Sequence, residues 1–263
     1  MRYPILALVL VLGLAAIWPA TARAQVVDLT PDRESVIALE WSKPFVGDSD
    51  LGFATSSLLF RSLFRVSDRT RLVGDLGISH ARFGGTSATS LSNLEVGVVV
   101  VDAEADPVAR FTASLPTASD LQGEGAAAFT GALGAPLRLE RYLPDLWAVS
   151  GFFTPTKRQG ARQMGLRLGG TVLRPDGGDT EVLARYGAWV RGGGSVRFGV
   201  EVQGQAILTQ DDLSLGERTD HEIVGTLGFG EGGIRPDLFV RVPLVEDGFG
   251  DAVDLVAGIR LTF

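Results

Sequence analysis

The C-terminal stretch Val253–Phe263 reads V-D-L-V-A-G-I-R-L-T-F and alternates in polarity along its whole length. A period of two predicts a β-strand with one apolar face and one polar face. Such a strand is half-buried in water, whereas in a bilayer it places lipid on one side and a polar lumen on the other. In a bilayer, Asp254 and Arg260 would face the lumen. The side chains expected to face lipid are Val253, Leu255, Ala257, Ile259, Leu261 and Phe263.

The N-terminus has the pattern of a secretory signal peptide. Arg2 supplies the positive charge, Ile5–Ile17 is an apolar run, and Ala22-Arg23-Ala24 is a small-x-small cleavage site. A retained N-terminal anchor is the alternative. We expect residues 1–24 to be removed and residues 25–263 to form one domain.

Composition narrows the classes of function. The sequence has no Cys and only two His, so we expect no metal site and no cofactor. Removing Arg2 and Arg23 leaves 22 Lys and Arg against 31 Asp and Glu, a net charge of −9. An acidic exported chain is not expected to bind nucleic acid. No run of 18 or more apolar residues follows the signal, so no transmembrane helix is expected.

Segments of alternating polarity recur along residues 25–263, separated by clusters of Gly, Asp, Pro and Ser. We count twelve, although ten or fourteen strands remain open because the sixth is nearly continuous in hydrophobicity. The predicted strands are Ser35–Lys43, Phe53–Val66, Thr70–Phe83, Ser90–Asp102, Pro107–Leu115, Asp145–Pro155, Ala161–Arg174, Thr180–Arg191, Ser195–Thr209, Thr219–Phe229, Ile234–Val245 and Ala252–Phe263.

The connections between these segments favour a membrane barrel over a soluble sandwich. Every even-numbered connection has five residues or fewer, and Thr156–Gly160 is one of them. The odd-numbered connections include the long stretches Pro44–Leu51, Pro116–Pro144 and Gln210–Arg218. Short turns on one side, long loops on the other and an even strand count are typical of outer-membrane barrels. The fold class expected is an all-β, transmembrane, antiparallel up-and-down barrel of about twelve strands.

The signal, the alternating strands and the terminal L-T-F resemble bacterial outer-membrane β-barrel proteins. The resemblance implies location in the outer membrane, contact with its lipid and lipopolysaccharide, and recognition of Phe263 by the barrel-assembly machinery. A narrower resemblance covers Leu94–Ser119. There V-x-V-x-V followed by F-T-A-S-L-P-T-A-S is similar to barrels linked to meta-pathway phenol degradation, which are thought to be transporters. Ala118 stands where that motif has Gly.

Charged residues in mid-strand positions on the polar face are candidates to line the lumen. Expected inward arginines, Arg65 among them, outnumber expected inward acids, which would favour anionic solutes. We therefore expect a narrow channel or transporter for small solutes. A structural or interaction barrel without transport and, as a minor alternative, a barrel hydrolase remain open. The candidates are Glu40, Arg61, Asp75, Glu95, Arg110, Arg167, Arg185, Arg197, Glu201, Arg241, Asp254 and Arg260.

The long connection Pro116–Pro144 is unusual in composition. Its Ala-rich part Gly123–Gly134 predicts a short helix, ended by Pro136. Two placements are open, an external cap over the barrel mouth and a constriction folded into the lumen. Arg138 and Arg141 could contact lipid phosphate or an anionic solute.

No catalytic residue is expected. Ser79 and His80 are neighbours on one predicted strand, so their side chains point to opposite faces and cannot pair. His221, beside Glu222, is expected to be a rim residue. The sequence therefore predicts a protein that is not an enzyme.

Overall fold

A computed structural model of the chain describes residues 35–46, 55–83, 86–104, 106–118, 125–133, 136–160, 162–210, 218–230, 233–244 and 252–263. The predicted signal peptide lies outside these ranges.

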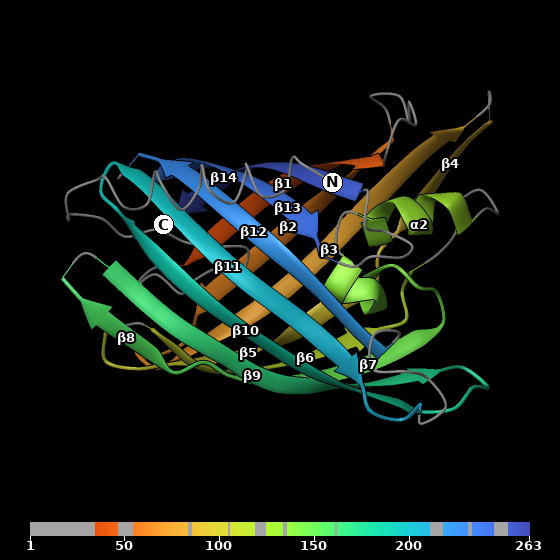
Figure 1. Cartoon of the computed structure of the whole chain (residues 1–263), viewed down its shortest axis with the longest axis horizontal. Coiled ribbons are helices and arrows are strands. Elements are labelled where there is room, and N and C mark those ends of the chain that lie inside the picture. Colours follow the sequence, from red (N-terminus) through yellow and green to blue (C-terminus); the bar gives the residue numbers. More distant parts are fainter. Residues whose placement is uncertain are drawn as a thin grey trace.

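Twelve antiparallel strands close into a barrel in chain order, because β14 pairs with β1 and β9 pairs with β10. Figure 1 shows these strands crossing the barrel obliquely. Two further short strands, β4 and β8, pair with β3 and β9. The barrel strands are β1 (Val36–Val46), β2 (Ser56–Arg65), β3 (Thr70–Phe83), β5 (Leu94–Val101), β6 (Pro107–Leu115), β7 (Leu146–Phe153), β9 (Arg162–Pro175), β10 (Glu181–Gly193), β11 (Val196–Ile207), β12 (Thr219–Phe229), β13 (Ile234–Pro243) and β14 (Ala252–Thr262).

The predicted fold class is confirmed, and each predicted segment overlaps one barrel strand. Two details were wrong. Residues expected to form the turn Thr156–Gly160 include β8 (Thr156–Gln159), and β4 (Thr86–Leu91) was not expected. The predicted strand Ser90–Asp102 is interrupted at Ser92-Asn93, where β4 ends and β5 begins, because these two side chains bind other parts of the chain.

Apolar and polar side chains alternate between the two faces of the wall. On β14, Ile259 is 53% exposed on the outer face, whereas the adjacent Arg260 is 3% exposed. Phenylalanines at strand ends are also exposed, and the rings of Phe64 and Phe263 meet edge to face at 6.5 Å. An outward apolar surface of this kind suits contact with lipid.

The interior is filled by both charged and apolar side chains. Val36, Leu63, Val73 and Val99 belong to a buried apolar cluster near the end of the barrel that carries the short turns. Phe239 of β13 is buried between Val224 of β12 and Val256 of β14, in a separate apolar cluster. The inner face is therefore packed over part of its length, as expected for a barrel of this size.

The connection from β6 to β7 contains α2 (Gly125–Leu133), as predicted, and a 3-10 helix, η1 (Pro136–Arg141). Both lie toward the end of the barrel with the long loops (Figure 1). Ala127 of α2 packs against Ala81 and Ala88 of β3 and β4. A Cβ on Gly131 would lie 2.2 Å from the ring of Tyr142, so only glycine allows this contact. Within the described ranges, no helix is long and apolar enough to cross a bilayer.

Candidate functional site

The residues proposed from the sequence to line the lumen all have side chains that are buried or, for Arg167, largely buried. Arg65 differs, since its side chain is 45% exposed and pairs with exposed Asp68 at the β2–β3 turn. The alternation of the strands therefore places one face of charged groups together inside the barrel.

One set of wall charges lies on the adjacent strands β1, β2, β3, β5 and β6. Arg61 lies between Glu40, at 3.3 Å, and Asp75, at 3.4 Å. Arg110 reaches Glu95 at 2.7 Å and Asp75 at 3.6 Å. Each of these charges has at least one opposite partner, which offsets the cost of burying it.

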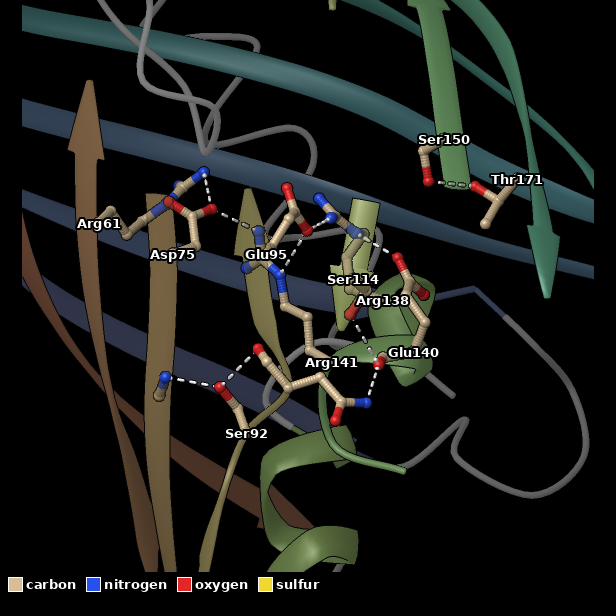
Figure 2. A network of polar contacts seen from close by, with 12 residues as sticks. Arg61, Asp75, Ser92, Glu95, Ser114, Arg138, Glu140, Arg141, Ser150 and Thr171 are labelled. Atoms are coloured by element: carbon tan, nitrogen blue, oxygen red, sulfur yellow. Dashed lines mark hydrogen bonds and ion pairs between the residues drawn. The ribbon is translucent and has the colours of Figure 1, made fainter. Parts of the chain in front are cut away.

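The η1 segment extends this network across the lumen. Arg138 pairs with Glu95, and Arg141 contacts Asp75 at 2.8 Å. Glu140 points the other way and forms two contacts with Arg185 of β10, at 2.9 and 2.8 Å. Because β10 lies four strands away from β5 around the ring, η1 connects two separate parts of the wall. Figure 2 shows Arg138, Glu140 and Arg141 among the wall residues.

This position decides between the two placements left open by the sequence for the connection. Glu140 is 1% exposed and Arg141 is 5% exposed, so η1 is folded into the lumen and is not an external cap. Arg138 and Arg141 bind carboxylates of the barrel wall. The sequence had predicted contact with lipid phosphate or an anionic solute. We call residues 125–142, comprising α2, η1 and Tyr142, the plug.

Asn93, the single asparagine of the sequence, fixes the plug to the wall. Its Nδ2 donates hydrogen bonds to the carbonyl oxygens of Glu140 and Leu143, both at 2.8 Å. Its Oδ1 accepts from the N–H of Ala118 at 2.7 Å, and its own N–H donates to the carbonyl of Arg141 at 2.6 Å. One side chain thus binds both ends of the β6–β7 connection.

Asn93→Ala is expected to loosen the plug while leaving the barrel closed. The change leaves buried carbonyl and N–H groups without partners, at a cost of about 1–3 kcal/mol for each. Faster proteolysis within residues 119–142 of the folded protein would show this effect, with Thr89→Ala as a control on neighbouring β4. Equal cleavage rates for wild type, control and variant would contradict the role of Asn93.

Three further charge clusters lie elsewhere on the inner face of the described wall. Arg241 contacts Asp254 at 3.0 Å, and Ser42 donates to the same carboxylate at 2.7 Å. Arg167 contacts Glu201 at 3.0 Å. Arg197 and Arg260 share Asp237, at 3.3 and 3.1 Å.

Sequence reasoning missed Asp237, although its place on the polar face of β13 would have identified it. Glu140 was missed because it lies on no strand, and no periodic signal marks it. With these acids included, the excess of arginine is smaller than the sequence suggested. Across the described residues, ten Arg and Lys side chains and nine Asp and Glu side chains are buried.

The histidines lie apart from this network. Ser79 is fully buried on the inner face, whereas His80 shares a hydrogen bond with Thr89 at 2.9 Å. His221 shares a hydrogen bond of 2.6 Å with the hydroxyl of Tyr186. Among the described residues, no group of three or more His, Cys, Asp or Glu side chains is arranged to hold a metal ion.

Comparison with known proteins shows similarity in fold. Neither a protein-family model nor a curated protein sequence matches the chain. An outer membrane channel from Pseudomonas putida F1 superimposes with a TM-score of 0.60 and 11% identity, over 92% of this chain and 100% of that one. LpxR from Salmonella typhimurium gives a TM-score of 0.54 and 10% identity, over 87% and 100% of the two chains. The chain therefore shares its fold with a bacterial outer-membrane channel.

Proposed function

We propose that this protein is a bacterial outer-membrane β-barrel that forms a narrow channel for small solutes, with the plug as its gate. The exposed apolar side chains of the outer wall and the fold shared with an outer-membrane channel support the location and the class. We place the short turns in the periplasm and the long loops outside the cell, which is the orientation typical of outer-membrane barrels.

The way in which the plug is held carries the proposal. It enters and leaves the lumen at the same end. Its described contacts to the wall are ion pairs and hydrogen bonds of Asn93, Glu95, Asp75 and Arg185, together with the packing of Ala127 on Ala81 and Ala88. These contacts can break without opening any strand pair of the closed barrel. Movement of the plug would therefore widen the path and leave the wall intact.

The charges around the plug suggest a weak preference for anions. Arginine exceeds acid by five to four in the network of Arg61, Arg110, Arg138, Arg141 and Arg185 with Glu40, Asp75, Glu95 and Glu140. The stretch Leu94–Ser119, which includes β5 and β6, also carries the resemblance to barrels linked to aromatic degradation. Thr117 there accepts from the N–H of Leu94 at 2.7 Å, at the entry to the plug. We propose small aromatic acids as solutes.

The selectivity of the refolded protein in planar bilayers tests this function. Under a KCl gradient, we expect the sign of the reversal potential to indicate that anions permeate more readily than cations. When benzoate replaces chloride, we expect the current to persist. Arg138→Gln should reduce the preference, because it removes the one positive charge by which arginine exceeds acid in this network. Arg174→Gln removes the same charge from an exposed position and serves as the control. Preference for cations in the wild type would contradict the proposed solute class.

A structural or interaction barrel is the second candidate, because the paired charges and apolar clusters fill much of the described lumen. Absence of conductance from both the wild type and a plug-deleted variant would favour it. We propose no catalytic role and no cofactor. The expected partners remain outer-membrane lipid, lipopolysaccharide and, through Phe263, the assembly machinery.

A further inference from the structure

The outer wall carries an apolar groove of about 650 Å³ over β9, β10 and β11. Grooves of this size hold ligands with the dimensions of a drug molecule. It lies on the outer face, away from the charged network. Its apolar lining includes Met164, Leu166, Ala188, Val190, Phe198 and Val202.

The groove arises because a small side chain lies between larger ones. In the sheet register Ala188 of β10 is flanked by Leu166 of β9 and Val202 of β11. Val190, Leu166 and Val202 around it are between 44% and 51% exposed, so they stand out from the wall. Pro155, which lies in the connection between β7 and β8, also lines the groove.

One end of the groove is basic. Lys157 of β8, which is paired with Met164, lines the groove. Arg162 precedes Met164 by two residues on β9 and therefore projects from the same face. Both side chains are exposed, and both lie beside the β8–β9 turn, at the end of the barrel with the short turns.

We propose that this groove binds one acyl chain of a phospholipid from the periplasmic leaflet, and that Lys157 and Arg162 bind its phosphate. The proposal rests on the membrane location proposed above. An apolar trough with cations at one end matches the two chemical parts of a phospholipid, and Arg and Lys are the side chains that bind phosphate. A second copy of the chain fits less well, since a two-fold contact over the groove would bring the basic ends of both copies into an apolar interface.

Retention of phospholipid by the folded full-length barrel tests the site. The probe is phosphatidylglycerol added to the protein in detergent and counted by native mass spectrometry. Ala188→Phe fills the groove, and we expect about tenfold weaker retention of the lipid. Ala257→Phe adds the same ring to an exposed position on β14 and serves as the control, with retention unchanged.

The double variant Lys157→Gln, Arg162→Gln distinguishes binding of the phosphate from binding of the acyl chain. This variant should lose phosphatidylglycerol and keep neutral diacylglycerol. Equal retention by Ala188→Phe and Ala257→Phe, or a dimer in place of lipid on the wild type, would overturn the proposal. Failure of the folded protein to insert into liposomes would instead refute the membrane location, while loss of conductance alone would leave the lipid site standing.

Discussion

A variant in which residues 119–142 are replaced by a short Gly-Ser linker is expected to conduct severalfold more than the wild type. The linker can be short because Ala118 and Leu143, at the two cut ends, both hydrogen-bond to Asn93 and therefore lie close together. The barrel strands keep all of their pairings, since β6 and β7 remain paired through Ser114 and Ala148. The deletion removes the segment that joins two parts of the wall.

The charges left behind need not prevent folding of this variant. Asp75 and Glu95 lose Arg138 and Arg141, but Arg61 and Arg110 remain beside them. Arg185 loses Glu140 and would face the water that replaces the plug. Three acids and three arginines of the network remain, so the wall stays neutral in sum. A wet lumen stabilises such charges better than a dry one.

Single-channel recording in planar bilayers measures the effect, and a heat-modifiable band in detergent gels shows that the deleted variant is folded. Asn93→Ala should give an intermediate conductance, because it loosens the same segment without removing it. A folded deletion variant with the conductance of the wild type would mean that the plug is not the barrier. The path would then be closed elsewhere, for example by the apolar cluster around Leu63 and Val99.

The limits of prediction from this sequence follow from the range of the interactions involved. The strands β3, β6 and β12 have the predicted bounds, because alternation of polarity is a local property that each strand carries by itself. The strand β8 reads T-K-R-Q and has no apolar alternation, so a turn was predicted there. The break at Ser92-Asn93 was missed, although two consecutive polar residues there interrupt the alternation between Leu91 and Leu94.

In the candidate site, too, residues with a local signal could be predicted and long-range contacts could not. A mid-strand charge such as Arg61 or Arg260 could be assigned to the inner face from its neighbours alone. The partner of Arg185 could not be assigned in this way. Glu140 lies 45 residues away in the sequence, on a segment without strand periodicity. Only the three-dimensional path of the plug brings the two together.

Glu140→Gln is expected to lower the free energy of unfolding by about 3 kcal/mol, because removing one partner of a buried ion pair leaves the other charge uncompensated. Glu140 is 1% exposed and Arg185 is 6% exposed. Urea titration of the barrel in lipid vesicles, followed by tryptophan fluorescence, measures the change. Arg185→Gln alone should also destabilise, and the double variant should lose less than the sum of the two.

The exposed pair Arg65 and Asp68 is the matched control, since the same substitutions there should couple by only about 0.2–1 kcal/mol. Salt gives a second contrast, because screening weakens the exposed pair more than the buried one. Additive effects of Glu140→Gln and Arg185→Gln would show that the contact to β10 does not hold the plug.

The effect of Glu140→Gln on stability should depend on pH, because of the pKa of Glu140. This residue lies on the plug and outside the strands. Burial alone would raise this pKa, but the guanidinium groups of Arg185 and Arg138 outweigh burial and lower it to about 2. A carboxyl with a lowered pKa stabilises the folded state above its unfolded value of 4.5 and loses this contribution as the pH falls toward its folded value. The difference in stability between wild type and Glu140→Gln should therefore be complete at neutral pH and shrink below about pH 4.5. A difference that stayed constant down to the folded pKa would assign the effect of the variant to packing, because only the ionised carboxylate can account for a loss in that window.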